Sequence, residues 1–172
     1  MHSAQTFLAV AVAVIACGYD LRTRRIPNPL TFGAALSAVA FNVVATGSSG
    51  FMTAGGGWLL GVVLFIPFFA LGGMGAGDVK LLGAIGAWLG PEAVLHVALY
   101  TALAGGPIAI VVALRSGYLR QALSNLKTLV TFWLTVGVQP VEGITLDGQQ
   151  NSPRLAYALP MLAGLLVTVW LQ

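Results

Sequence analysis

Residues 51–71 read FMTAGGGWLLGVVLFIPFFAL, a stretch without a single charged side chain. A helix that crosses the hydrocarbon core of a bilayer needs about 20 predominantly apolar residues. This stretch therefore predicts a transmembrane helix, and the rest of the chain has a similar composition. Of its 172 residues, 58% are hydrophobic and 8% are charged, whereas a soluble domain carries about 25% charged residues. The sequence predicts a protein embedded in a membrane.

Six apolar runs, separated by turns rich in glycine, proline, asparagine and serine, predict six transmembrane helices. The runs are 2–19, 30–46, 51–71, 79–89, 93–114 and 155–171. Pro29 is expected to be the first residue of the second helix, with Asn28 as its N-cap. Four glycines in the third run predict close packing against another helix: Gly55, Gly56, Gly57 and Gly61. The expected fold is all-α, with residues 1–172 forming one membrane-embedded domain.

Residues 119–138 are apolar enough to suggest a seventh span, but their pattern favours a different placement. Apolar side chains recur with helical spacing from Leu119 to Val136, while Arg120 and Lys127 lie on the opposite face. This pattern is typical of an amphipathic helix that lies on a membrane surface. A seventh span would also move Arg154 to the other side of the membrane. We therefore expect six spans and one interfacial helix on the cytoplasmic side.

The positions of lysine and arginine predict the orientation, because positively charged residues near span ends stay in the cytoplasm. If the N-terminus is outside, all eight basic residues fall on the cytoplasmic side: Arg22, Arg24, Arg25, Lys80, Arg115, Arg120, Lys127 and Arg154. Glu92 then lies on the opposite side. We expect a multi-pass protein of the cytoplasmic (inner) membrane. The three arginines after the first span are expected to set the topology, with contact to a substrate as the alternative.

Several classes of partner and site do not fit the sequence. The net charge of +3 is small, and the basic residues do not form the dense cluster that a nucleic-acid surface requires. No nucleic acid is therefore expected as a partner. The single cysteine, Cys17, lies in an apolar run, so neither a disulfide framework nor a cysteine-based zinc site is expected.

Two acidic residues lie at the ends of predicted spans. Asp20 ends the first and Asp78 begins the fourth, both on the predicted cytoplasmic side. An acid within a membrane costs about 2.5–3.5 kcal/mol on insertion scales, so it is a functional candidate by default. The fourth span is short, since twelve residues cover only about 18 Å of a core about 30 Å thick. Asp78 and the glycine-rich segment before it are thus expected in a hydrated pocket inside the protein.

Two carboxylates that share such a pocket are expected to hold one proton between them near neutral pH. The ionised acid can take a proton from a water that attacks a peptide carbonyl, while the protonated acid polarises that carbonyl. The pair then protonates the leaving amine, so no metal or organic cofactor is expected. The deeper position of Asp78 makes it the expected holder of the proton. Lys80 is expected either to tune the pair as a charge partner or to anchor the helix at the interface.

Each acid also has a simpler interpretation. Asp78 could act only as a helix N-cap, and Asp20 could form an ordinary interfacial ion pair with the neighbouring arginines. A function of another class is a small proton-coupled transporter that uses Asp20 and Asp78 as a relay. Both acids lie at one face, however, and the spans show no clear inverted repeat. An inactive scaffold would not explain why both acids are present.

The residues around both acids resemble the type IV prepilin peptidase family. Gly75-Ala76-Gly77-Asp78 is similar to the GxGD motif of intramembrane aspartyl proteases. Asp20, followed by a basic stretch and Ile26-Pro27-Asn28, resembles the first catalytic segment of prepilin peptidases. The resemblance implies that Asp20 and Asp78 are catalytic, and that the substrate is a prepilin with a basic leader and an apolar helix.

The same resemblance suggests roles for neighbouring residues and a subtype. Gly75 and Gly77 would allow a close approach of the substrate, and Asn28 belongs to the first catalytic segment. Longer members of the family carry an N-terminal cytoplasmic insertion with paired cysteines and a methyltransferase activity. This chain is similar instead to the compact peptidases of Tad/Flp-type pili and to archaeal preflagellin peptidases, so methylation is not expected.

Overall fold

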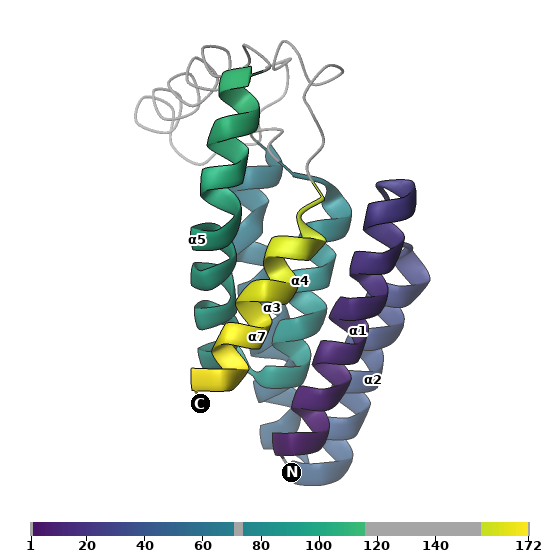
Figure 1. Cartoon of the computed structure of the whole chain (residues 1–172). Coiled ribbons are helices and arrows are strands. Elements are labelled where there is room, and N and C mark those ends of the chain that lie inside the picture. The colour runs from purple at the N-terminus through teal and green to yellow at the C-terminus, as the bar shows by residue number, and fades with distance from the viewer. Residues whose placement is uncertain (1, 71–73, 116–155, 172) are drawn as a thin grey trace, which may run out of the picture.

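A computed structural model describes residues 2–70, 74–115 and 156–171 of the chain. Within these ranges the protein consists of six helices: α1 (His2–Thr23), α2 (Asn28–Thr46), α3 (Ser48–Ala70), α4 (Ala76–Leu89), α5 (Pro91–Arg115) and α7 (Ala158–Leu171). The helices alternate in direction along one bundle, and the two termini lie at the same end (Figure 1). The opposite end holds the last turn of α1 and the first turn of α4, and we call it the site end. The protein is therefore all-α, as predicted.

α4 is the central helix of the bundle. It contacts α1, α2, α3, α5 and α7, and its residues are buried on all sides from Asp78 to Trp88, apart from the partly buried Lys80. A helix that is apolar all round belongs in a core. Its 14 residues cover about 21 Å at 1.5 Å per residue, less than the thickness of a bilayer core.

Glycines allow α3 to approach α4 closely. A Cβ atom added to Gly57 would overlap the carbonyl group of Gly86, and one added to Gly61 would come within 2.7 Å of a second α4 carbonyl oxygen. The prediction of close packing is confirmed for these two residues, whereas Gly55 and Gly56 have nothing within 4 Å of an added Cβ. The backbones of α3 and α4 can meet only where both lack side chains.

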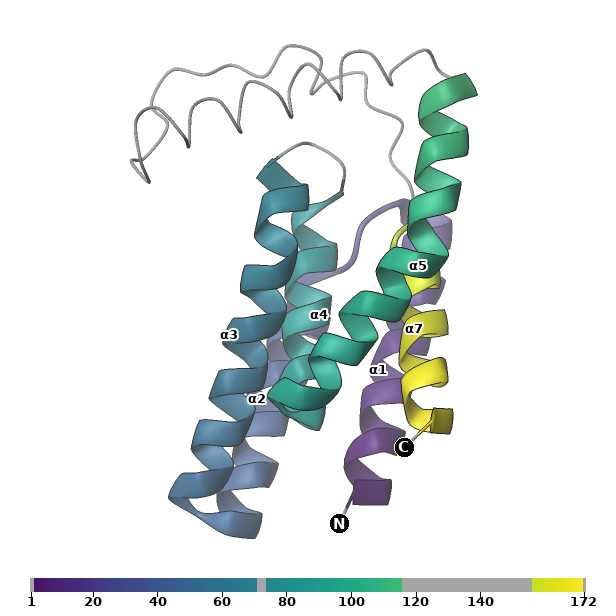
Figure 2. The ribbon, with the colours of Figure 1, turned by 90° about the vertical axis from the view of Figure 1, so that its left-hand side faces the viewer.

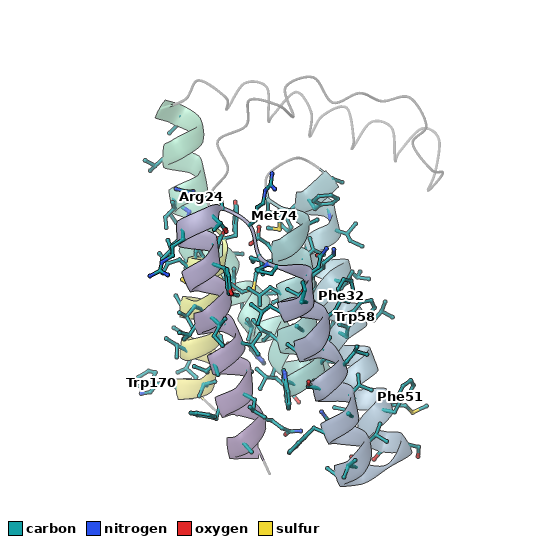
Figure 3. The ribbon with its side chains drawn as sticks, turned by 90° about the vertical axis from the view of Figure 1, so that its right-hand side faces the viewer. Arg24, Phe32, Phe51, Trp58, Met74 and Trp170 are labelled. Carbon is teal, nitrogen blue, oxygen red and sulfur yellow. The ribbon has the colours of Figure 1, made fainter. Side chains whose placement is uncertain are left out.

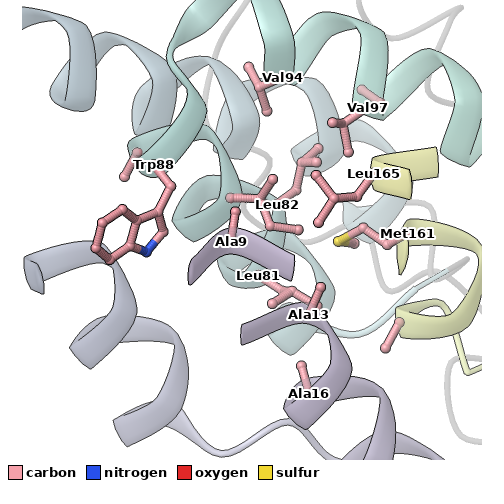
Figure 4. Close-up of a cluster of buried hydrophobic side chains, with 14 of the residues drawn as sticks. Ala9, Ala13, Ala16, Leu81, Leu82, Trp88, Val94, Val97, Met161 and Leu165 are labelled. Carbon is pink, nitrogen blue, oxygen red and sulfur yellow. The ribbon is translucent and has the colours of Figure 1, made fainter. Parts of the chain in front are cut away.

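The core and the outer surface are both apolar. The core joins side chains from all six described helices. Figure 4 shows part of it, including Ala9, Ala13, Leu81, Leu82, Val94, Val97, Met161 and Leu165. Large apolar side chains also project outward, and Phe51 and Trp170 are examples (Figure 3). Three helices are long and apolar enough to cross a membrane, over Ala4–Thr23, Asn28–Thr46 and Ser48–Ala70, and Ala158–Leu171 is a shorter apolar helix. The chain is a polytopic membrane protein.

Several helix boundaries differ from the sequence prediction. α2 begins at Asn28 after Pro27, so the prediction that Asn28 caps this helix is wrong. The Asn28 side chain instead accepts a hydrogen bond from Lys80. α3 begins at Ser48 because Gly47 alone, with a φ of +67°, reverses the chain. Only glycine adopts that conformation readily.

The charged residues of the described ranges are sorted between the two ends of the bundle, and the orientation in the membrane stays a prediction. The five basic residues in the described ranges lie at the site end: Arg22, Arg24, Arg25, Lys80 and Arg115. Glu92 lies at the opposite end, in the first turn of α5. The predicted interfacial helix over 119–138 lies outside the described residues, as does Arg154.

Candidate active site

Asp20 and Asp78 are brought together at the site end of the bundle. Asp20 lies in the last turn of α1, which extends beyond its predicted end to Thr23, and Asp78 lies in the first turn of α4. Each residue is only 6% exposed, and their carboxyl groups are close enough to interact electrostatically. Aspartate is almost never this deeply buried unless it is paired. The fold thus unites two acids that the sequence separates widely.

The Asp20 carboxyl group is held by the start of α7. The Ala158 amide donates a hydrogen bond to Asp20 Oδ2 at 3.3 Å, and Ala158 is the first residue of α7. Free amides at a helix N-terminus, together with the helix dipole, favour a negative charge next to them. The start of α7 therefore fixes the position of the Asp20 carboxyl group.

The two oxygens of Asp78 have different surroundings. Oδ2 accepts a hydrogen bond from the Gly75 amide at 3.0 Å, within the same motif. Oδ1 is buried and has no hydrogen-bond partner among the described residues. A buried charge without partners is costly, whereas a protonated oxygen can donate to a group that enters the site. Oδ1 is therefore the oxygen of Asp78 that is left to bind a group that enters the site.

The two motif glycines allow tight packing around Asp78. A Cβ atom on Gly75 would lie 3.3 Å from Asp78 Oδ2, and one on Gly77 would lie 3.1 Å from the Ile26 Cβ atom. Gly77 thus lets the connection between α1 and α2 lie directly on the first turn of α4. Replacing either glycine would press on Asp78 or on this connection.

Lys80 and Asn28, two further predicted site residues, bind each other. Lys80 Nζ donates to Asn28 Oδ1 at 2.9 Å and lies 5.1 Å from the centroid of the Phe32 ring. Both contacts join α4 to the start of α2. In the described ranges Lys80 makes no ion pair with an acid, and its role in tuning the aspartates stays a prediction.

The three arginines after Asp20 lie at the surface of the site end. Arg22, Arg24 and Arg25 are exposed, and Figure 3 shows Arg24 at the end of α1. Arg24 has a φ of +53°, and its amide donates to the Asp20 carbonyl oxygen at 2.9 Å. This left-handed residue ends α1 one turn after the acid.

Tyr157 and Ala158 lie at the site although the sequence pattern does not predict them there. Burial raises the pKa of the Tyr157 phenol, and the nearby Asp78 carboxylate adds to the rise. Tyr157 therefore lies within electrostatic range of one aspartate, and its neighbour Ala158 binds the other. No sequence signal marked them, because a backbone amide is common to every residue except proline. In the described part of the chain, no group of three or more histidine, cysteine or acidic residues could hold a metal ion.

Comparisons with known proteins cover the part of the chain that carries both aspartates. The family model described as "Type IV leader peptidase family" matches residues 7–110. Two curated proteins, each named prepilin leader peptidase/N-methyltransferase, come from Burkholderia pseudomallei strains 1026b and K96243. Each is 35% identical over 102 residues, or 56% of this chain. The match covers only 33% of each relative. No solved structure matches the chain significantly. The family match ends before α7.

Proposed function

Because the chain belongs to the type IV leader peptidase family, we propose that it is an aspartyl endopeptidase that removes the basic leader of a prepilin. The observation that carries this proposal is that two buried carboxyl groups, Asp20 and Asp78, lie at one end of the bundle within electrostatic range of each other. Both lie in the segment that the family model matches. In this proposal the six described helices cross the cytoplasmic membrane, the N-terminus is outside, and cleavage occurs at the cytoplasmic face.

The unequal surroundings of the two acids support unequal roles. Asp20, next to the α7 N-terminus, acts as the general base and takes a proton from the attacking water. Asp78 donates a proton from its free oxygen to the peptide carbonyl. The tetrahedral intermediate then collapses as the pair protonates the leaving amine, so that water is divided between the two products. Neither acid needs a cofactor for these steps.

The finer assignment to Tad/Flp-type prepilins rests on the resemblance of the sequence to compact peptidases. Co-expression with a Tad/Flp-type prepilin and with a conventional type IV prepilin tests it directly. We expect the first to be shortened and the second to be processed more slowly. Equal processing of both prepilins would contradict the subtype.

Substitution of each acid tests the proposed mechanism. Asp20→Asn and Asp78→Asn preserve the size of the side chain but remove its ability to exchange a proton, so each is expected to abolish processing of a co-expressed prepilin. The amount of each variant in the membrane fraction shows whether insertion is intact. Glu92→Gln, at the opposite end of the bundle, is the matched control and should process normally. Normal processing by either aspartate variant would exclude the paired mechanism.

The geometry does not favour the proton-coupled transporter. Both acids lie at the site end, whereas a relay needs titratable groups along the path through the membrane. Proton flux into proteoliposomes that is lost in Asp20→Asn and Asp78→Asn would support the transporter instead. We expect no such flux above that of empty liposomes.

A further inference from the structure

A pocket of about 210 Å³ opens next to the aspartates. It lies at the site end, where α7 packs against both α1 and α5 (Figure 1 and Figure 2). Its lining includes Arg24 just after α1, Gly105 and Ile108 from α5, Tyr157 just before α7, and Leu159 and Pro160 from α7. We call it the Tyr157 pocket. Most of its lining surface is apolar, and Arg24 and Tyr157 are the lining residues with polar side chains.

The Tyr157 pocket adjoins the candidate site through two short connections. Arg24 follows Asp20 by one helical turn, and its amide bonds to the Asp20 carbonyl oxygen. Ala158, which lies between the lining residues Tyr157 and Leu159, bonds to the Asp20 carboxyl group. A peptide whose cleaved bond lies at the aspartates therefore has a neighbouring residue within reach of the pocket.

The size and chemistry of the pocket indicate what it binds. Sites for whole small molecules occupy about 300–1,000 Å³, so a pocket of about 210 Å³ suits one large side chain. Apolar walls favour an apolar side chain, because its burial removes apolar surface from water. Gly105 keeps the pocket walls together, since an added Cβ would lie 3.2 Å from Pro160 and 3.5 Å from the Tyr157 ring.

We propose that the Tyr157 pocket binds the apolar side chain of the substrate residue that directly follows the cleaved bond. This inference rests on the proposed function, in which a basic leader is cut from an apolar helix. The residue after the cut is then the first of the apolar segment, and the leader itself is too polar for these walls. Ile108 and Leu159, which are 47% and 50% exposed, stand at the edges of the pocket and set the size of the side chain that fits.

A change of side-chain preference tests the pocket. Four prepilin substrates are prepared, with alanine, leucine, phenylalanine or tryptophan after the cleaved bond. The purified wild-type enzyme and the pocket variants process each substrate in proteoliposomes. The value of kcat/KM is then compared for each pair of enzyme and substrate. Ile108→Trp fills the pocket. The kcat/KM for the phenylalanine substrate, divided by that for the alanine substrate, should therefore fall about tenfold or more. Ile108→Ala and Leu159→Ala enlarge it, and should raise the relative cleavage of the tryptophan substrate about tenfold.

The control is Leu103→Trp, which adds the same ring to α5 at a position that is 63% exposed and does not line the pocket. For Leu103→Trp, the ratios of kcat/KM among the four substrates should stay within about twofold of the wild-type ratios. Ile108→Trp could instead slow cleavage of all four substrates equally, while Ile108→Ala and Leu159→Ala leave the ratios of kcat/KM among the substrates unchanged. The pocket would then not bind the side chain of the residue after the cleaved bond. A lipid tail in the pocket would give that same uniform result. Cleavage that survives Asp78→Asn would overturn the proposed function instead, so the two failures are distinguishable.

Discussion

Gly77 is the residue on which the packing around Asp78 depends most directly. An added Cβ would press on Ile26, and would therefore move the connection between α1 and α2 away from the first turn of α4. Gly77→Ala is expected to reduce the rate of prepilin processing by about 10- to 100-fold, because small displacements of a reacting group have large effects on rate.

The matched control for Gly77→Ala is Gly18→Ala, two residues before Asp20 on α1. An added Cβ at Gly18 has nothing within 4 Å, and alanine is the better helix former by about 1 kcal/mol. This variant should process prepilin at the wild-type rate in isolated membranes. Equal rates for the two variants would show that the contact between Gly77 and Ile26 does not matter for cleavage.

The bond between Lys80 and Asn28 is suited to a double-mutant cycle. Lys80→Met and Asn28→Ala each remove one partner, so both are expected to lower the free energy of unfolding in detergent. Their effects should couple by about 0.5–1 kcal/mol, since the bond involves a charged donor at a partly exposed site. Strict additivity of the two effects would show that the bond contributes nothing to stability.

The proposed tuning of the aspartate pair by Lys80 has a separate measurement. If Lys80 tunes the pair, the pH-rate profile of processing by Lys80→Met shifts relative to the wild type. A profile identical to that of the wild type would leave only the structural contacts with Asn28 and Phe32 for this lysine.

At the residue scale, the sequence predicted site residues that lie together in a short motif. It did not predict Ala158, a site residue whose partner lies far away in the chain. The acid of the GxGD motif and its Gly75 partner are three residues apart, so local pattern was enough to single them out. The Ala158 amide that holds Asp20 comes from 138 positions further along the chain. Only the folded bundle shows that the start of α7 belongs to the site.

At the scale of helices, the contact between α3 and α4 depends on two glycines that oppose α4. Gly57→Ala would drive a Cβ into the Gly86 carbonyl, and the backbones would have to separate. We expect a loss of about 1–3 kcal/mol in the free energy of unfolding, the usual cost of overpacking. Thermal unfolding in detergent measures it.

Gly56→Ala is the control for this contact, since its added Cβ meets nothing within 4 Å. Because alanine favours helix more than glycine does, Gly56→Ala should keep or raise the midpoint of thermal unfolding. A similar loss in both variants would mean that helix formation itself, and not the approach of α3 to α4, is disturbed.

The existence of each helix was predictable because strong turn residues separate the apolar runs. The exact residues at which the helices begin and end were not predictable. Charged residues ended the predicted first span, whereas α1 continues through Asp20 to Thr23. α1 can continue through this charged stretch because arginine is a good helix former, and because its positive charge is favourable at the negative end of the helix dipole. The reversal at Gly47 was predicted to need four residues, yet one glycine with positive φ is enough.

At the scale of the whole molecule, the orientation can be measured with cysteine labelling. The single native cysteine, Cys17, is 6% exposed and should not react with a membrane-impermeant maleimide. Ser49→Cys and Arg25→Cys replace exposed residues at opposite ends of the bundle. With the N-terminus outside, Ser49→Cys should be labelled in intact spheroplasts and Arg25→Cys only after permeabilisation. The reverse pattern would invert the topology.

The bond between Asp20 and the start of α7 also has a consequence for biosynthesis. α1 and α4 leave the ribosome well before α7, because the Ala158 amide follows Asp20 by 138 residues. Until α7 has inserted, Asp20 lacks the amide that binds its carboxyl group, and the Tyr157 pocket lacks four lining residues: Ala156, Tyr157, Leu159 and Pro160. A nascent or prematurely terminated chain therefore carries both acids without the bond between Asp20 and the start of α7. In the proposed function, proteolytic competence would therefore be acquired only late in translation.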